Sequence, residues 1–481
     1  MESQESEIGK LGAVTSQPSR VCLREESESV SSGAPPAPSS RSKSRLVALT
    51  HRMLPKGQLA RGVLVIASGH AGGYALAAAS LPILTRLYSP ADFGVFGVYV
   101  SVLSMLGIVA GFRYEAAISI PEDDETAADL IVLSLSSACL LCGASMLTVW
   151  LLGDDWLSRM PLGGLQPYLH LLALNAVACV GFQVVLFWAV RKKAFSHLAR
   201  MRIALAVAMV VTQVSAGLAH LGPTGLLLGQ FMGNAAGVVY SLIASRKCLP
   251  PLRHVNAKGV CSVAVRFRQF PMFGAGAELA NNACTALPPI LLTATFGSKI
   301  AGLFLLGWRA VGAPLTLLVV PIARVYLSEA SRIVHQTPEK LSPFFVRTIR
   351  RLTLTATGPV TVLAFTAPWL FPVVFGQEWN DAGIYCSLVC PLLLCQLFSV
   401  SVRPTFDVLN KQHLHLLVSV FGVGLTVLGV WLPAYAGMSA SAAILSLSVM
   451  GCLGYLLAAG LAWMVLPGIS NPLSSSSNGS S

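Results

Sequence analysis

The sequence predicts an all-α polytopic membrane protein, with about twelve transmembrane helices arranged as two six-helix halves. Three observations predict this fold. Of the 481 residues, 54% are hydrophobic and only 11% are charged, and the mean hydropathy is +0.68. Long apolar runs alternate with short polar breaks, and basic residues gather in alternate breaks. Because soluble domains carry roughly 25% charged residues, this chain cannot cover a water-facing surface of its size. A large soluble enzyme is therefore excluded.

The apolar runs are long enough to cross a bilayer. A helix needs about 20 apolar residues to span roughly 30 Å of hydrocarbon. Twelve segments meet this requirement, and the eighth is open to continuation as far as Tyr326. They are 62–86, 93–112, 128–152, 167–190, 203–221, 223–244, 271–296, 300–323, 353–375, 382–402, 413–434 and 438–466.

Lys and Arg are unevenly divided between the loops. With the N-terminus placed in the cytoplasm, the cytoplasmic loops hold 19 of them and the outer loops hold three, Arg86, Arg159 and Lys299. Cytoplasmic loops of membrane proteins carry such an excess, so the pattern predicts a multi-pass protein of the inner (cytoplasmic) membrane with both termini cytoplasmic. The net charge of +12 reflects this topology, since no basic, aromatic-rich surface suggests nucleic-acid binding.

Composition divides the chain into five parts. Residues 1–57 are rich in Ser, Pro, Glu and Arg and lack an apolar period or a signal-peptide core, so a disordered tail is predicted. Residues 1–52 are open to two interpretations, a regulatory tail or an over-extended gene start ahead of Met53. The remaining parts are a first six-helix bundle (58–244), a cytoplasmic linker (245–270), a second six-helix bundle (271–466) and a disordered C-terminal tail (467–481).

A faint internal repeat relates the two bundles. Leu84-Thr85 and Gly94-Val95-Phe96 recur 208 residues later as Leu292-Thr293 and Gly302-Leu303-Phe304. Six helices separate the copies, so both would have the same orientation in the membrane. Parallel repeats of this kind occur in secondary transporters, where the substrate site lies between the halves. The sequence therefore predicts two parallel bundles around a central cavity.

Polar residues inside the spans mark the candidate site. A charge at the bilayer centre costs about 2.5–3.5 kcal/mol even on a lenient scale, so such groups face a cavity or one another. Glu278 lies about 10 Å into the seventh span, and Arg309 lies about 14 Å from the outer end of the eighth. Asn281 and Asn282 follow Glu278 at i+3 and i+4, so the three are expected to share a face. Two interpretations stay open: a Glu278–Arg309 ion pair that joins two helices, or a solvated cavity lining, which the asparagines favour.

Four further residues complete the candidate site. Arg113 ends the second span, Arg86 lies at the outer end of the first, and Arg324 lies near the inner end of the eighth. Each is either a cavity residue or an interfacial anchor whose charge reaches the headgroups. His70, in the glycine-rich first span, is either a proton-coupling group or a neutral, packed histidine. The candidate substrate-binding residues are thus Arg309, Glu278, Arg113, Asn281, Asn282, Arg86, Arg324 and His70.

No motif for catalysis, metal or cofactor accompanies these residues. Cys139 and Cys142 have CxxC spacing but lie within a span without a nearby His or second pair, which is typical of small apolar helix residues. The chain has no Walker A sequence, no Gly-x-Ser-x-Gly with partners and no His-Glu-x-x-His site. The outer loops are short, and the largest runs only from Gly153 to Gln166. We expect no enzymatic activity, no metal and no cofactor.

Several segments resemble the polysaccharide biosynthesis flippases of the multidrug/oligosaccharidyl-lipid/polysaccharide exporter superfamily. The similarity runs from about residue 60 to 465, preserves order and spacing, and leaves out the N-terminal tail. In the first half it is carried by Leu87-Tyr88-Ser89-Pro90-Ala91-Asp92-Phe93-Gly94, Arg113-Tyr114-Glu115-Ala116-Ala117-Ile118 and Pro121-Glu122-Asp123-Asp124-Glu125. In the second half it is carried by Phe267-Arg268-Gln269-Phe270-Pro271, Leu287-Pro288-Pro289-Ile290-Leu291-Leu292, Phe296-Gly297, Gly302, Arg309, Pro314 and Phe375-Gly376-Gln377-Glu378-Trp379-Asn380-Asp381-Ala382-Gly383.

The resemblance implies a flippase that carries a polyprenyl-pyrophosphate-linked oligosaccharide across the membrane by alternating access, for lipopolysaccharide or exopolysaccharide synthesis. It implies as partners the lipid bilayer, the lipid-linked oligosaccharide, and the polysaccharide polymerase and chain-length machinery. Arg pairs well with phosphate oxygens. We expect Arg309, with Arg113 as second candidate, to contact the pyrophosphate, and Glu278 to tune Arg309 or to couple ion movement.

Three other functions stay open. A cation-coupled exporter of drugs or metabolites would belong to the same superfamily. A membrane polymerase or ligase of lipid-linked sugars would need a large outer loop with catalytic Arg or His residues, which this chain lacks. A non-transporting scaffold would give Glu278 and Arg309 no purpose beyond pairing.

Overall fold

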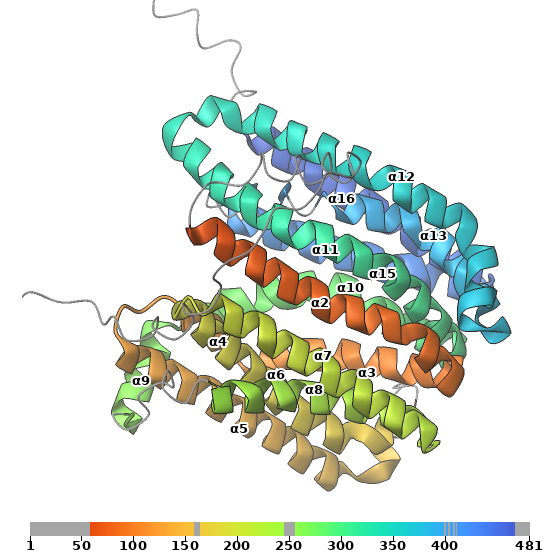
Figure 1. Cartoon of the computed structure of the whole chain (residues 1–481), viewed down its shortest axis with the longest axis horizontal. Helices are drawn as coiled ribbons and strands as arrows, with labels where there is room; N and C mark the ends of the chain where they lie inside the picture. The colour runs from red at the N-terminus through yellow and green to blue at the C-terminus, as the bar shows by residue number, and fades with distance from the viewer. Residues whose placement is uncertain are drawn as a thin grey trace, which may run out of the picture. The chain divides into compact units, whose positions relative to one another are not determined.

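The computed structural model describes residues 58–157, 164–244, 255–398, 401–402, 405–406, 409 and 411–466, and all regular structure among them is helical (Figure 1). The chain divides into two units, Met1–Lys56 and Gly57–Ser481, and the described helices belong to the second unit. The predicted tails, 1–57 and 467–481, and the linker residues 245–254 lie outside the described residues.

The described residues contain twelve long helices, and each coincides with one predicted span. Those of the first half are α2 (Gln58–Leu87), α3 (Pro90–Ala110), α5 (Asp124–Leu157), α6 (Leu169–Arg191), α7 (Phe195–Leu218) and α8 (Pro223–Ala244). Those of the second half are α10 (Ala275–Phe296), α11 (Ser298–Gln336), α12 (Leu341–Phe375), α13 (Asn380–Gln396), α15 (Gln412–Tyr435) and α16 (Ala440–Val465). Helix α11 continues beyond Tyr326, and α12 begins well before the predicted residue 353.

Short helical turns connect the long helices. They are α4 (Tyr114–Ala117), η1 (Gln166–Tyr168), α9 (Ala257–Arg266), the π-helical turn η4 (Phe270–Gly274), η5 (Pro338–Lys340) and η6 (Gln377–Trp379). Helix α3 begins in a capping box, in which the side chains of Ser89 and Asp92 each accept a hydrogen bond from the other residue's backbone N–H, with Pro90 at the first helical position. Helix α11 follows Gly297, whose φ of +89° is readily reached only by glycine.

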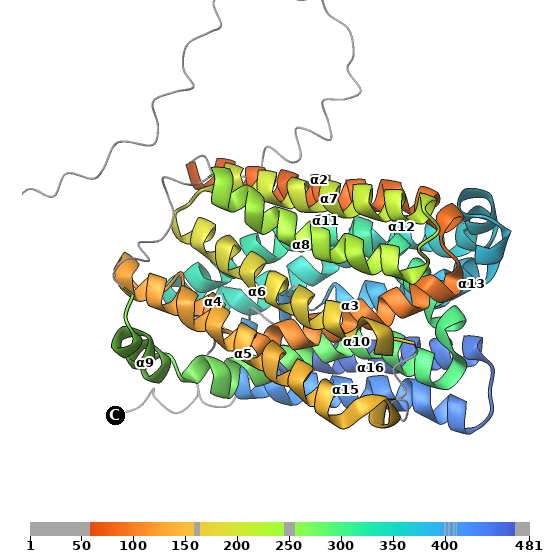
Figure 2. The same cartoon turned by 90° about the horizontal axis from the view of Figure 1, so that it is seen from below.

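The two halves pack their helices in the same order. In the first half α2 packs on α7, α7 on α8, α6 on α8, α5 on α6, and α3 on α6. In the second half the corresponding pairs are α10 on α15, α15 on α16, α13 on α16, α12 on α13, and α11 on α13. Figures 1 and 2 show these two groups of helices, which meet along α2, α3, α10 and α11. The internal repeat seen in two short sequence matches is therefore a repeat of the whole six-helix arrangement.

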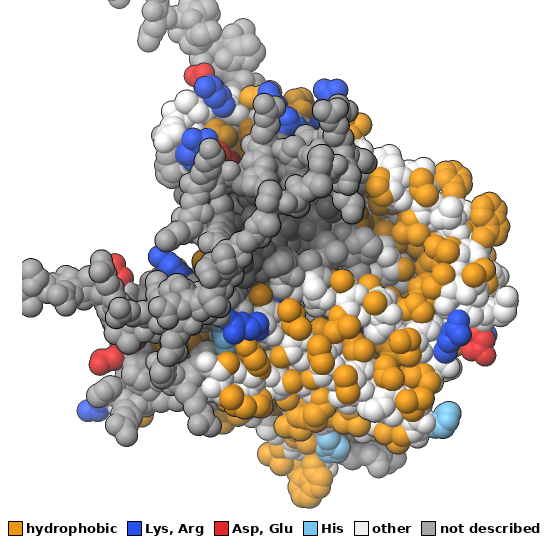
Figure 3. Space-filling model, in the orientation of Figure 1, with side chains coloured by type: hydrophobic (Ala, Val, Ile, Leu, Met, Phe, Trp, Pro, Cys, Tyr) orange, Lys and Arg blue, Asp and Glu red, His pale blue; other side chains and the backbone are white. Residues whose placement is uncertain are grey.

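The outward faces of the helices are apolar. Leu140, Trp150, Trp369 and Val373 expose 73–77% of their surface. On the face drawn in Figure 3 hydrophobic side chains cover most of the lower middle and the right side, where few Lys or Arg side chains are seen. Such a large exposed apolar area marks a surface that meets lipid rather than water.

Within the described part of the chain, eight helices are long and apolar enough to cross a membrane, namely α3, α5, α6 with η1, α7, α8, α12, α15 and α16. Three of the other four, α2, α10 and α11, meet at the junction of the halves and carry most of the predicted site residues. The chain is thus a multi-pass membrane protein.

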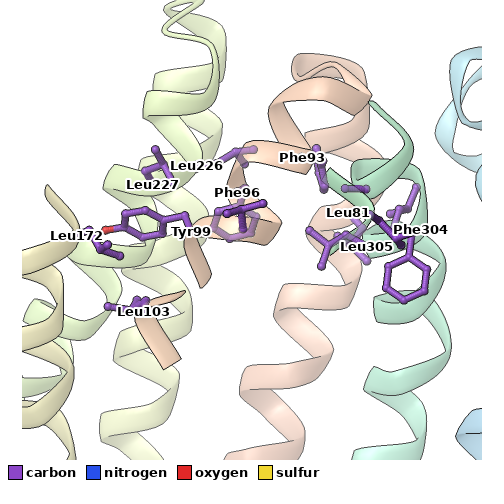
Figure 4. Close-up of a cluster of buried hydrophobic side chains, with 14 of the residues drawn as sticks. Leu81, Phe93, Phe96, Tyr99, Leu103, Leu172, Leu226, Leu227, Phe304 and Leu305 are labelled. Atoms are coloured by element: carbon purple, nitrogen blue, oxygen red, sulfur yellow. The ribbon is translucent and has the colours of Figure 1, made fainter. Parts of the chain in front are cut away.

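Helix α3 lies at the centre of the largest hydrophobic core. Phe93, Phe96, Tyr99 and Leu103 expose at most 3% of their surface, and Figure 4 shows them beside leucines of α6, α8 and α11. The helix is enclosed because it contacts both halves, packing on α6 and α8 in its own half and on α10 and α11 in the other.

A chain of buried hydrogen bonds ties α3, α6 and α8 together. The Asn234 amide donates to Asn175 Oδ1 at 2.9 Å, the Asn175 amide donates to Tyr99 Oη at 2.9 Å, and the Tyr99 hydroxyl donates to the carbonyl of Leu171 at 3.3 Å. Asn175 is completely buried. Each side chain in the network fills the hydrogen-bonding need of the next one, so removing one member lowers the stability of the fold.

Asn175→Ala should destabilise the protein, because it leaves the buried Asn234 amide without its acceptor and removes the hydrogen bond that Asn175 donates to the Tyr99 hydroxyl. The expected loss is about 1–3 kcal/mol for each group left unsatisfied. Thermal unfolding in detergent measures it, and a double-mutant cycle with Tyr99→Phe tests the connection. The two substitutions should be less than additive, whereas strict additivity would contradict a shared network.

Candidate functional site

The two halves touch most closely where α3 meets α11. A Cβ atom at Gly94 would overlap the carbonyl of Ser298, and one at Gly302 would overlap the carbonyl of Pro90. Each glycine is the fifth residue of its helix, and the two are the matching positions of the internal repeat. We call this pair the glycine contact. It brings the two backbones together at a distance that no side chain permits.

Trp379 of η6 reinforces the same end of the junction. Its side chain is 1% exposed, its Nε1–H donates to the carbonyl of Thr85 at 3.1 Å, and its ring meets the edge of Phe93 at a centroid distance of 5.0 Å. The tryptophan comes from the second half, while Thr85 and Phe93 belong to the first. Trp379 therefore attaches the end of α2 and the start of α3 to the second half.

At the other end of α3, the halves are joined by polar contacts. The guanidinium of Arg113 lies 4.0 Å from the carboxylate of Glu278, and the side chains are 27% and 28% exposed. The hydroxyl of Ser104 donates to Asn282 Oδ1 at 2.9 Å. Arg113 is held in a turn in which it and Phe112 both have positive φ, +61° and +47°. Such conformations are uncommon for residues with side chains and typically cost about 1–3 kcal/mol, so the rest of the fold holds this turn in place.

Arg309 occupies the middle of the junction. Its guanidinium lies over the ring of Phe96 from α3, 4.7 Å from the centroid, and Tyr74 of α2 is close enough to interact with it electrostatically. No carboxylate of the described residues lies within 4.0 Å of this guanidinium. Arg309 is half-buried, which makes it a cation between the halves without a neighbouring acid in the described part of the chain.

Of the two interpretations left open by the sequence, the Glu278–Arg309 ion pair is not formed between these described residues, because Glu278 faces Arg113 and Arg309 faces Phe96. Their depths explain the difference. Glu278 lies in the first turn of α10, far from the short connection to α11. Counted from that connection, Glu278 is about five helical turns away and Arg309 about three, so their levels differ by about 10 Å. The expectation that Glu278 tunes Arg309 is corrected to a contact between Glu278 and Arg113.

The expected polar stripe on α10 is also divided. Glu278 and Asn282 face the first half, through Arg113 and Ser104. Asn281 instead lines a largely apolar pocket inside the second half, with a volume of about 90 Å³, beside Cys284, His415 and Ser419. Consecutive helical residues point about 100° apart, so Asn281 and Asn282 serve different surfaces.

The remaining candidates are less central. Arg86 is exposed in the last turn of α2. His70 lies within α2 and Arg324 within α11, but their side chains lie outside the described part of the structure. The structure thus brings Arg113, Glu278, Asn282 and Arg309 to the junction of the halves, and it places Asn281 and Arg86 elsewhere.

Glu115 is a residue that the sequence analysis quoted but did not select. It lies in α4, between the spans α3 and α5, and is only 4% exposed. Its Oε2 has no hydrogen-bond partner in the described structure, and a Cβ at Gly111 would approach that atom to 2.6 Å. Arg113 and Glu278 act on it electrostatically, and its own charge acts on Cys179 of α6. No sequence rule identifies it, because a glutamate so soon after a span normally lies in a solvated loop.

Burial is the largest influence on the pKa of the Glu115 carboxyl and raises it above its ordinary value. A hydrogen bond from the backbone N–H of Glu115 itself and the charge of Arg113 work against this rise in pKa, and the charge of Glu278 adds to it. The protonated form is therefore favoured in the folded protein relative to the unfolded chain.

Glu115→Gln should make the protein more stable at alkaline pH and leave its stability nearly unchanged at acidic pH. A carboxyl whose pKa is raised by folding contributes stability below its unfolded pKa, and that contribution is lost as the pH rises through the folded pKa. The gain at high pH should be about 1–3 kcal/mol, the typical cost of an unsatisfied buried group. Melting temperatures across pH measure it, with Glu329→Gln, in an exposed i,i+3 pair with Arg332, as control. Parallel curves for the wild type and Glu115→Gln would contradict it.

Comparison with known proteins identifies the fold and the family. The family described as polysaccharide biosynthesis protein matches residues 83–383. The fold is similar to a multidrug resistance MATE family transporter of the MOP superfamily in its inward-facing conformation, with a TM-score of 0.64 and 13% identity over 84% of this chain and 97% of that one. The outward-facing conformation of such a transporter gives a TM-score of 0.55 at 12% identity, over 84% and 95% of the two chains.

A MOP superfamily transporter from Pyrococcus furiosus, described as having a binding pocket of reversed polarity, gives a TM-score of 0.59 at 12% identity, over 84% and 95% of the two chains. No curated protein matches the sequence. At these identities the solved structures show the fold alone, which is a transporter fold, while the family match covers more than half of the chain and confirms the resemblance seen in the sequence. This chain is a multi-pass membrane protein that belongs to the polysaccharide biosynthesis protein family, and its fold is similar to that of MATE transporters.

Proposed function

We propose that this protein is a flippase that moves a polyprenyl-pyrophosphate-linked oligosaccharide from the cytoplasmic to the outer leaflet of the inner membrane, with both its termini in the cytoplasm. The observation that carries the proposal is the pair of guanidinium groups, Arg113 and Arg309, between two parallel halves. Arg309 has no carboxylate close by in the described structure. A cation kept between moving halves suits an anionic headgroup that hydrocarbon excludes.

The Arg113–Glu278 contact is suited to exchange. At 4.0 Å and with both side chains about a quarter exposed, it is a loose and hydrated ion pair. A pyrophosphate oxygen offers Arg113 a shorter, charge-assisted hydrogen bond than Glu278 does. Cargo binding then replaces a contact between the halves with a contact to the substrate.

The glycine contact closes the opposite end of the junction between the two halves from the Arg113–Glu278 contact. With the N-terminus in the cytoplasm, the α2–α3 and α10–α11 connections face outward, so the glycine contact and Trp379 close the outer end. Rocking of the two halves would open this end and close the other, as alternating access requires. The lipid tail stays in the bilayer, and the polymerase and chain-length machinery receive the cargo on the outer side.

Deleting the gene tests the function. We expect the lipid-linked glycan to accumulate in the cytoplasmic leaflet, protected in intact spheroplasts from a membrane-impermeant glycan-modifying enzyme and exposed in inverted vesicles. The wild-type gene should restore the outer-leaflet pool. An unchanged distribution of the glycan would overturn the proposal, and loss of resistance to cationic drugs instead would favour the exporter of small molecules.

A further inference from the structure

We propose that Glu115 is a proton-binding residue of this site, and that its protonation strengthens the binding of a phosphate-type anion at Arg113. The inference rests on the proposed function, because it assigns a regulator to the same arginine. Glu115 would act through Arg113 and would not touch the cargo, so it is a positioning residue.

The first observation is an imbalance of charge. Arg113 lies beside Glu278 and within the electrostatic influence of Glu115, so one guanidinium serves two carboxylates. With both carboxylates ionised, the cluster has a net negative charge and repels an anion. With Glu115 neutral, the cluster is balanced, and displacement of Glu278 leaves Arg113 free for the anion.

The second observation is the difference between the two carboxylates. Glu278 is 28% exposed on its side chain, so water stabilises its charge. Glu115 is 4% exposed, and its Oε2 lies against the backbone of Gly111 without a hydrogen-bond partner in the described structure. A buried ionised carboxylate without full hydrogen bonding is strongly disfavoured. Of the two carboxylates, Glu115 is therefore the one whose burial favours a bound proton.

The surroundings of Glu115 contain few other titratable groups. The elements that pack around it contribute Arg113 from its own turn, Glu278 from α10 and Cys179 from α6, and no described side chain of α5 acts on it. Arg113 and Glu278 are both partly exposed, so water reaches the edge of the cluster and can carry a proton to it.

Proton binding at Glu115 and anion binding at Arg113 must each influence the other. If a proton on Glu115 increases anion affinity, the anion increases proton affinity by the same factor. When the anion neutralises Arg113, the guanidinium no longer stabilises ionised Glu115. We expect the affinity for the anion to change about tenfold between protonated and ionised Glu115, within the range of roughly 5- to 150-fold that such couplings show.

Calorimetry with inorganic pyrophosphate tests the linkage on the purified full chain. Titrations in two buffers of different ionisation enthalpy give the number of protons taken up for each pyrophosphate bound. The wild type should take up more protons than Glu115→Gln, by a margin that approaches one and follows the pH. Subtracting the variant removes the protonation of pyrophosphate itself. Equal proton uptake in the two proteins would overturn the inference, and Arg113→Ala should abolish binding in both backgrounds.

An infrared titration without ligand separates this inference from the proposed function. In an ester-free detergent, the carbonyl band of a protonated carboxyl should persist in the wild type to higher pH than for an ordinary carboxyl. It should remain in Glu278→Gln and vanish in Glu115→Gln. If the band is present but pyrophosphate does not bind, the cargo and the linkage are wrong, and the proton site stands. If the wild type shows no such band, Glu115 is not the proton site, whatever binds at Arg113.

Discussion

Arg309→Ala should reduce surface polysaccharide to near the level of the gene deletion. The guanidinium lies between the halves over Phe96, without a described carboxylate nearby, so its removal takes away positive charge and leaves no described acid unpaired. A hydrogen bond to a charged group contributes about 1.5–3 kcal/mol, which corresponds to about 10- to 100-fold in affinity. The measurement is complementation of the deletion strain, scored by surface polysaccharide at matched amounts of protein in the membrane.

Two matched variants sharpen this test. Arg309→Lys keeps the charge but loses the planar, bidentate group, so it should recover only part of the function. Arg332→Ala removes an arginine of the same helix from an exposed i,i+3 pair with Glu329 and should complement fully. Full polysaccharide from Arg309→Ala at normal membrane levels would sink the assignment of Arg309 to the cargo.

Gly302→Ala should force α3 and α11 apart. The new Cβ would overlap the carbonyl of Pro90, and a backbone atom cannot turn aside as a flexible side chain can. Overpacking of this kind costs about 1–3 kcal/mol. We expect a lower melting temperature and faster hydrogen–deuterium exchange in residues 88–98 and 297–305, because their backbone amides become easier to open. Under the proposed function transport should also fall, since the halves can no longer close together at the glycine contact.

Gly460→Ala is the control for this substitution. Gly460 lies within α16, where an added Cβ meets nothing within 4 Å. Alanine in an open helical position is at least as stable as glycine, so this variant should melt at or above the wild-type temperature. If Gly302→Ala behaves like Gly460→Ala in stability and in exchange, the glycine contact does not hold the halves together.

The fold was largely predictable because its cause is local. Each span is a run of apolar residues of bilayer length, so its position follows from composition without knowledge of its neighbours. The limits of α11 and α12 were missed because both helices continue past the apolar runs into polar residues, up to Gln336 and from Leu341. The backbone hydrogen bonds of a helix can continue beyond the hydrocarbon layer of the membrane, so the apolar run does not mark the end of the helix.

The site was only partly predictable because it depends on how each helix is rotated about its axis and on how deep each residue lies in the membrane. Buried charges identified Glu278 and Arg309, but their true neighbours depend on how each helix faces the other half. The turn at Phe112 and Arg113, with positive φ at both, directs Arg113 to Glu278, and sequence gives no sign of such a turn without glycine. The same turn buries Glu115, which sequence placed in a loop.

The glycine contact also has a meaning for the history of the chain. In a symmetric dimer of identical chains, a residue near the two-fold axis contacts the same residue of the other chain. A substitution at that position therefore changes both sides of the contact at once. Gly94 and Gly302 behave as two copies of one position that have come face to face. A half-length ancestor that paired with itself would have needed this glycine only once to bring two backbones together. Within a single chain the two copies of every position are independent, so one half can carry Arg309 where the matching position of the other half carries Ser101.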